Sequence, residues 1–181
     1  MKSIIKRNLS LETKYTLIDK KYISLEDGFG CTCANCGKLI ANIATVKNES
    51  SEVFNIGFDC LETFLINNSL LDGKSILEYQ QFKKFLPTYL KRSKDIKEFI
   101  LNNKSLNVVS IEVDTLDFKN HVENWGKYHK QQYLTYYYIF ENGKKYNSNL
   151  KLANEVNIND FLDVVKSVCN VNIIKKSYEC N

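Results

Sequence analysis

The sequence predicts an α+β protein in which a small cysteine-containing hairpin and helix module is followed by helices and an α+β C-terminal region. Three patterns support this fold class. Four of the six cysteines fall within residues 31–60, among short strand-like segments. Apolar residues recur every three or four positions through residues 75–103, as on one face of a helix. Strand-like and helix-like segments then alternate, so we expect three parts, at residues 1–70, 71–104 and 105–181.

The first part reads as four short strands and a helix. The strand-like segments are residues 15–18, 22–25, 39–46 and 53–56. The polar run Asp19-Lys20-Lys21 predicts a turn between the first two, and the last two predict a hairpin. Residues 59–66 predict a helix with Asp59 as its N-cap, because a carboxylate accepts from the free N–H groups of the first turn.

The second part is a helical stretch that contains the single proline. Proline lacks a backbone N–H and is unfavourable inside a helix, so we expect Pro87 to divide residues 75–103 into two helices.

The third part mixes strands and helices. Strands are expected at residues 107–113, 133–140 and 171–174, and helices at residues 118–128 and 159–168. Asn142-Gly143 predicts a type I′ turn after the second strand. Asn159 or Asp160 is the expected N-cap of the second helix.

The cysteine motif points to a metal. Cys33 and Cys36 have the C-x-x-C spacing at which both sulfurs of a tight turn reach one ion, and Gly37 tolerates the positive φ of such a turn. Cys60 lies at the expected start of a helix, where the N-terminus favours a thiolate. Because Zn²⁺ prefers four tetrahedral ligands and accepts thiolate sulfur, we expect a structural zinc site that stabilises a treble-clef-like or ribbon-like module.

The fourth zinc ligand stays open. Cys31 is the nearest further thiol, although three ligands within six residues are crowded. Asp59 is an alternative through a carboxylate oxygen, and the distant candidates are His121, His129 and Cys180.

Redox and disulfide chemistry fit the motif less well. A redox C-x-x-C pair normally opens a helix, whereas strand-like residues follow Cys36 here. The first residues lack the apolar segment of a signal peptide, so we expect a cytoplasmic protein with reduced thiols. No apolar run approaches the about 18 residues of a membrane span, and no membrane partner is expected. Cys169 is expected to be a small core residue.

Positive charge is concentrated in the second part. The chain has a net charge of +4, while residues 74–104 hold eight basic and three acidic residues. The candidate phosphate-binding residues are Lys83, Lys84, Lys91, Arg92, Lys94 and Lys97. The alternative is an ordinary solvated helix face. With two arginines in the chain and no glycine-rich phosphate loop, base-specific readout is not expected.

A tyrosine-rich strand is the second candidate surface. In residues 133–140, Tyr136 and Tyr138 point to one face and Tyr137 to the other. An exposed face would stack on bases or contact a protein, whereas a packed face would be core. Which face is exposed stays open.

Enzyme motifs are missing from the sequence. Neither His121 nor His129 belongs to an H-E-x-x-H or H-x-E pattern, and no nucleophile elbow or P-loop is present. We therefore expect neither catalysis nor a small-molecule substrate. An enzyme with an unfamiliar site would have to join one of these histidines to Asp114, Asp117 or Glu123.

Residues 33–66 resemble a small zinc module of many uncharacterised phage and bacterial proteins. Its pattern is C-x-x-C-G, an apolar strand, a hairpin, then G-x-(D/E)-C and an amphipathic helix. Here it reads Cys33-Ala-Asn-Cys36-Gly37 and Gly57-Phe-Asp59-Cys60, and it covers under a fifth of the chain. The resemblance implies zinc and nucleic-acid association. It leaves Cys31 outside the shared pattern, which favours Asp59 as fourth ligand.

These observations predict a non-enzymatic, zinc-stabilised binding protein that engages nucleic acid, RNA or DNA, or a ribonucleoprotein. The alternative is a phage or mobile-element accessory protein that binds and inhibits a host defence effector such as a CRISPR nuclease, which makes the chain an anti-CRISPR candidate with a protein partner. This alternative is motivated by the chain's size and by the occurrence of the similar zinc module in phage proteins. The abundance of lysine, asparagine and isoleucine, which is typical of AT-rich genomes, also supports it.

Overall fold

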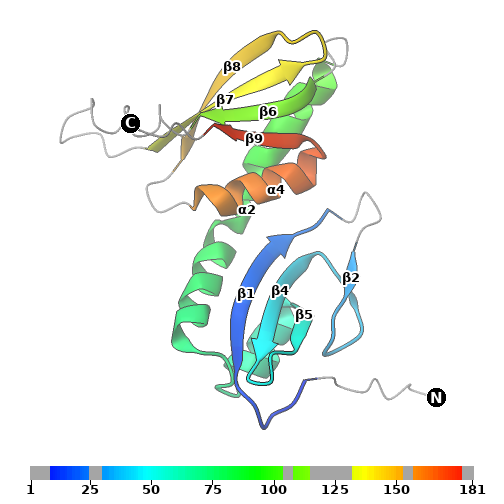
Figure 1. The fold of residues 1–181 in the computed structure, drawn as a ribbon, viewed down its shortest axis with the longest axis vertical. Coiled ribbons are helices and arrows are strands. Elements are labelled where there is room, and N and C mark those ends of the chain that lie inside the picture. The colour runs from blue at the N-terminus through cyan, green and yellow to red at the C-terminus, as the bar shows by residue number, and fades with distance from the viewer. Residues whose placement is uncertain (1–8, 25–29, 104–107, 115–131, 153–156, 177–181) are drawn as a thin grey trace, which may run out of the picture. The chain divides into compact units, whose positions relative to one another are not determined.

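The protein has the mixed α+β architecture that the sequence predicts (Figure 1). The computed structural model describes residues 9–24, 30–103, 108–114, 132–152 and 157–176. The chain forms two compact units, Met1–Thr88 and Tyr89–Asn181, and the division falls within one long helix. Within the described ranges, no helix is both long and apolar enough to cross a membrane.

Unit 1 is built on a three-stranded antiparallel sheet. Its strands β1 (Tyr15–Tyr22), β4 (Asn42–Asn48) and β5 (Val53–Gly57) are arranged in the order β1-β4-β5. The predicted hairpin is confirmed as the pairing of β4 with β5, and its core-facing residues include the fully buried Val46 and Ile56.

The predicted turn at Asp19-Lys20-Lys21 is wrong. These residues belong to the single strand β1, which pairs with β4 along its whole length. The register shifts between Leu17 and Asp19, so Ile18 is the extra residue of a β-bulge, and its side chain is 50% exposed. A bulge accommodates the polar run without ending the strand.

Unit 1 also contains a two-stranded ribbon and a short helical segment. The ribbon pairs β2 (Cys31–Thr32) with β3 (Leu39–Ile40). The segment consists of α1 (Phe58–Cys60) and the π-helical η2 (Leu61–Ile66). The predicted helix is therefore present, but its N-cap is Gly57, and Asp59 lies one residue inside the helix with no capping bond.

Helix α2 (Gly73–Asn102) runs through Pro87, so the predicted division into two helices is wrong. Buried residues continue along one side of the helix on both sides of the proline, which favours an unbroken helix. Pro87 and Lys83 are both exposed, so the Lys83 carbonyl that the proline cannot bond is on the solvent side. In unit 1, the rings of Tyr79 and Phe82 pack edge-on against Phe58, with centroids 5.0 and 5.9 Å away.

Unit 2 contains a four-stranded sheet in the order β8-β7-β6-β9. Its strands are β6 (Val108–Asp114), β7 (Gln132–Phe140), β8 (Lys145–Leu152) and β9 (Asn172–Lys176), and only the β6–β9 pairing is parallel. Helix α4 (Ile158–Cys169) lies beside the second half of α2, where the rings of Tyr89 and Phe161 are 5.8 Å apart (Figure 1). The helix expected at residues 118–128 lies outside the described residues.

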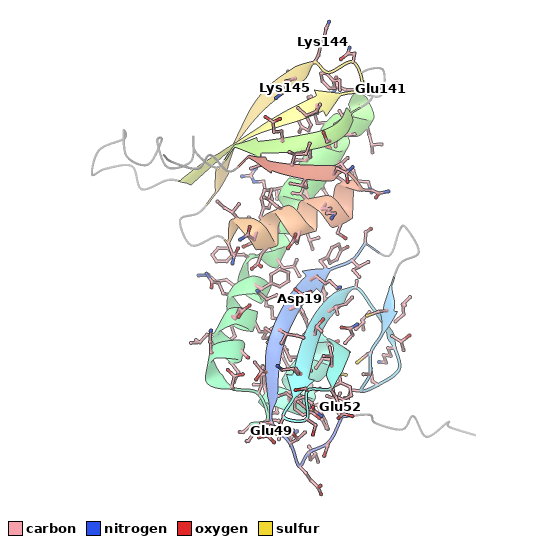
Figure 2. The ribbon with its side chains drawn as sticks, in the orientation of Figure 1. Asp19, Glu49, Glu52, Glu141, Lys144 and Lys145 are labelled. Carbon is pink, nitrogen blue, oxygen red and sulfur yellow. The ribbon has the colours of Figure 1, made fainter. Side chains whose placement is uncertain are left out.

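Two local predictions in unit 2 need correction. Residues 141–144 connect β7 to β8 (Figure 2), and the hydrogen bond from Phe140 N–H to the Lys144 carbonyl encloses residues 141–143. Among these, Gly143 alone has positive φ, at +75°, so the turn is not type I′. This is the pattern of a type I turn followed by a left-handed residue. The N-cap of α4 is Asn157, whose side chain accepts from the N–H groups of Asn159 and Asp160, the two residues that the sequence favoured as caps.

Candidate metal centre

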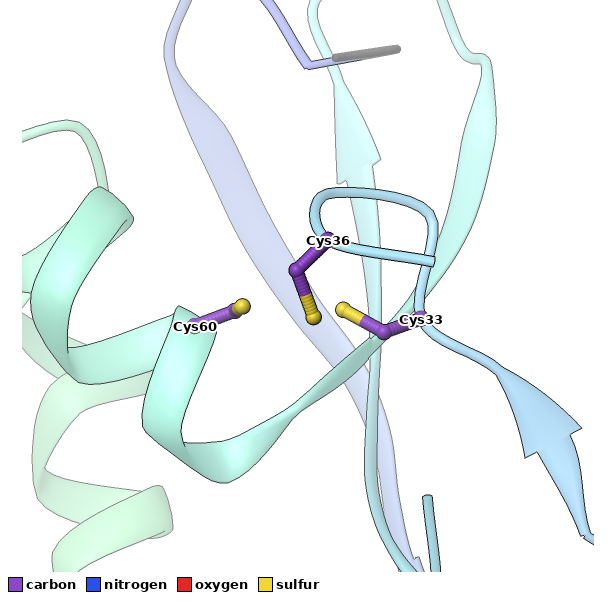
Figure 3. Close-up of side chains that lie close together, drawn as sticks. All are labelled: Cys33, Cys36 and Cys60. Atoms are coloured by element: carbon purple, nitrogen blue, oxygen red, sulfur yellow. The ribbon is translucent and has the colours of Figure 1, made fainter. Parts of the chain in front are cut away.

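Three thiols converge in unit 1. The Sγ atoms of Cys33, Cys36 and Cys60 all lie within 4.8 Å of one another, and Figure 3 shows the side chains pointing toward a common point. Cys33 and Cys36 come from the turn between β2 and β3, and Cys60 ends α1, directly after β5. Sulfur atoms this close can hold one metal ion.

The C-x-x-C turn is fixed by backbone hydrogen bonds. Cys33 N–H donates to the Lys38 carbonyl, and Gly37 N–H donates to the Cys33 carbonyl, both at 2.8 Å. Gly37 has φ of +72°, the left-handed conformation that glycine adopts most easily. Ala34 N–H donates to the Asn55 carbonyl at 2.8 Å and ties the turn to β5. The turn therefore holds its two cysteines in place before any metal binds.

Gly57 brings β5 and α1 close to the turn. Its N–H donates to Cys33 Sγ at 3.4 Å. A Cβ at this position would lie 3.0 Å from Cγ2 of Ile40, closer than ordinary packing allows. A larger residue would therefore require the Ile40 side chain to shift by a few tenths of an ångström.

The surroundings shift the pKa values of Cys33 and Cys60 in opposite directions. Burial alone would raise the pKa of Cys33, but N–H groups of Gly57, Cys36 and Asn35 donate to its sulfur, and the net pKa is lowered. Burial raises the pKa of Cys60 to about 11, the neighbouring Cys36 and Cys33 add to this, and hydrogen bonding from the Asn35 side chain opposes it. A divalent cation would stabilise all three thiolates together.

Cys31 and Asp59, the two nearer candidates for a fourth ligand, are not in this cluster. Cys31 lies in β2 opposite Ile40, is half-buried, and has a pKa raised mainly by burial. Asp59 is exposed on α1, and its carboxylate is not among the clustered donors. The further candidates His121, His129 and Cys180 lie outside the described residues.

Asn35 is a site residue that the sequence analysis missed. It lies between Cys33 and Cys36 in the chain, its side chain is 9% exposed, and its Oδ1 is buried with no hydrogen-bond partner in the structure. Buried polar atoms are nearly always paired, so an orphaned oxygen beside three thiols fits a centre that holds an ion. The feature of the sequence that could have indicated Asn35 is its position as a polar residue between the two cysteines of the C-x-x-C motif.

One side of the centre borders a pocket of about 330 Å³. Two of the thiols, Cys36 and Cys60, line it, together with Asp59, Lys38 and apolar residues that include Leu39 and Phe58. Cys33 does not line the pocket and is buried, so access from solvent is on the side of the other two sulfurs.

The basic residues of α2 differ in their surroundings. In unit 1, Lys83 pairs with Glu62, and Lys84 Nζ lies 5.0 Å from the centroid of the Phe85 ring.

In unit 2, Arg92 pairs with Asp95 at 3.7 Å, and Lys97 is half-buried. Lys91 and Lys94 are exposed, and they form no ion pair within the part of the chain that the structure describes. Among the candidate phosphate-binding residues of unit 2, these two lysines are the most accessible.

Tyr138 belongs to the packed face of the unit 2 sheet. It is 2% exposed, and its ring stacks on Phe99 of α2 at a centroid distance of 4.3 Å. Phe99 also stacks on Tyr146 at 5.2 Å. The Tyr138 ring therefore has no free face for a base. The Tyr136 side chain lies outside the described side chains.

No protein-family model, curated protein or solved structure matches the chain.

Proposed function

We propose that this chain is a non-enzymatic, zinc-stabilised protein that binds nucleic acid or a ribonucleoprotein. The observation that carries the zinc part is the cluster of three thiols at a C-x-x-C turn and a helix start. An all-sulfur donor set favours Zn²⁺ over Mg²⁺ or Ca²⁺, which prefer oxygen. A turn, a hairpin and a helix around one ion is a treble-clef-like arrangement.

The elements that meet at the cluster are too short to be stable by themselves. Strands β2 and β3 have two residues each, and α1 has three. An ion bound by Cys33, Cys36 and Cys60 would cross-link all of these elements, so metal binding would contribute directly to folding. This is the behaviour of a structural site.

The exposed lysines of α2 support the nucleic-acid part. Lys91 and Lys94 are three residues apart on the exposed side of the helix, so their ammonium groups are neighbours that can contact successive phosphates. Asp95 and Glu98 are also exposed on this helix and reduce its net charge. We therefore expect moderate affinity, strong salt dependence and little sequence preference.

Fluorescence anisotropy with single- and double-stranded DNA and RNA oligonucleotides tests this surface. Binding should weaken as salt rises, and the Lys91→Glu, Lys94→Glu double variant should bind at least about tenfold more weakly. The matched control reverses Lys144 (Figure 2) and Lys166, two exposed lysines of the same unit. Absence of binding, or an equal loss in both double variants, would refute the proposed surface.

A further inference from the structure

The thiol cluster supplies three donors, whereas a structural zinc site takes four. Asn35 is the polar side chain nearest in sequence to two of them, and it is buried with an unpartnered Oδ1. An unpaired buried carbonyl oxygen destabilises a fold, unless it has a partner that the polypeptide does not provide. A metal ion is such a partner.

The Asn35 amide lies beside the centre. The side chain hydrogen-bonds to Cys60, and since amide nitrogen is a donor without acceptor capacity, Nδ2 is the atom that faces the sulfur. Oδ1 is attached to the same carbon as Nδ2, so a half-turn of the amide about its last side-chain bond exchanges the two atoms and would bring the unpartnered oxygen to face the sulfur atoms. The chain bonds of Asn35 to the C-x-x-C turn keep it beside Cys33 and Cys36.

We propose that Asn35 Oδ1 is the fourth donor of the metal centre, an inference that rests on the proposed zinc site. Its charge suits the role. Three thiolates and Zn²⁺ have a net charge of −1, and a neutral amide oxygen adds nothing to it. Cys31 or Asp59 would make the net charge −2, which four-cysteine zinc sites also have, but neither belongs to the thiol cluster. Four protein donors would also leave no open position for a substrate, in keeping with a structural site.

The pocket beside Cys36 and Cys60 provides the competing arrangement. There, water or a small ligand enters the fourth position from solvent, and the metal has an open site. The two arrangements differ in their response to imidazole, which coordinates an open position and leaves a filled one unchanged.

Cobalt substitution of the full-length chain separates these arrangements. Metal content and visible absorption are measured for the wild type, Asn35→Ala, Asn35→Asp and the control Asn42→Ala, which changes an exposed asparagine of the pocket. We expect Asn35→Ala to change the cobalt spectrum, to become sensitive to imidazole, and to bind zinc roughly 10- to 100-fold more weakly. Asn35→Asp, which keeps an oxygen donor, should retain the four-coordinate spectrum, and the control should match the wild type.

Failure of the inference is distinct from failure of the proposed zinc site. A wild-type chain without bound metal would refute the zinc site itself. A metal-loaded wild type that responds to imidazole would refute Asn35 as fourth donor, and this result needs no variant to fold. An unchanged spectrum in Asn35→Ala would do the same. Asn35 as fourth donor would also be refuted by a spectral change in Cys31→Ser, Asp59→Asn or a variant of His121, His129 or Cys180.

Discussion

At the scale of single residues, the three clustered thiols are distinguished by burial and hydrogen bonding. Cys33 is buried and accepts the Gly57 N–H, whereas Cys36 and Cys60 are half-buried. The spacing of Cys33 and Cys36 could be read from the sequence because a four-residue turn fixes it locally. The burial of Asn35 could not be read from the sequence, because nothing local indicates that its amide turns inward rather than to solvent.

Serine variants of two cysteines test the composition of the cluster. Cys60→Ser removes one of three thiolates, so purified protein should contain little or no zinc by elemental analysis. Cys31→Ser should retain zinc, because this thiol is not among the clustered donors. Zinc lost from Cys31→Ser and kept in Cys60→Ser would contradict the assignment.

At the scale of elements, η2 is fastened to α2 by one carboxylate. Glu62 Oε1 accepts a hydrogen bond from the Tyr79 hydroxyl at 2.6 Å and pairs with Lys83. Lys83, which the sequence placed in a phosphate-binding surface, therefore has a partner within its own unit. The carboxylate thus connects the helical segment after Cys60 with the long helix.

This contact should make the stability of unit 1 depend on pH. The hydrogen bond from Lys83, then that from Tyr79, lowers the pKa of Glu62 below its ordinary value of 4.5. A lowered pKa contributes stability that is present above 4.5 and is lost as pH falls through the folded-state pKa. Chemical unfolding should therefore show a smaller acid-induced loss of stability in Glu62→Gln than in the wild type.

The control for this measurement is Glu49→Gln, at an exposed residue of the β4–β5 turn (Figure 2). It should leave the acid-induced loss close to that of the wild type. The interpretation is wrong if both glutamine variants change the pH dependence equally.

In helix α2, the burial of apolar side chains outweighs the low helix propensity of proline. Proline at position 87 predicts a break, yet the apolar face continues past it, since Tyr89 and Ile96 are buried beyond the proline as Phe85 and Leu86 are before it. Proline in a helix interior costs about 3 kcal/mol, while burying one large apolar side chain contributes about 1.5–3 kcal/mol. Several such side chains outweigh one proline.

At the scale of the whole molecule, the two units differ in how they are stabilised. Unit 2 has a four-stranded sheet whose cover includes the fully or nearly fully buried Phe161, Val164 and Val165 of α4. Unit 1 has its own core but also contains the short elements gathered at the thiol cluster. Metal should therefore matter to one unit only.

Removal of metal tests this difference. A chelator should increase amide hydrogen exchange in β2, β3, β5 and α1, because the ion no longer links them. Exchange in β6, β7 and α4 should stay unchanged. Cys60→Ser without chelator should reproduce the pattern, whereas a uniform increase over both units, or no increase, would contradict a metal role confined to unit 1.

The sequence by itself determined the α+β class, the C-x-x-C turn and most element positions, because these depend on periodicity and on contacts between near neighbours. It misplaced both helix N-caps and one turn type, since a shift of one or two residues changes those contacts while leaving the apolar pattern intact.

Only the tertiary structure decided which distant residues meet. It brought Cys60 to Cys33 and Cys36, left Cys31 aside, buried the Asn35 amide and turned Tyr138 into the core. Such contacts depend on how the sheet, ribbon and helices pack in three dimensions, and residue spacing along the chain does not determine that packing.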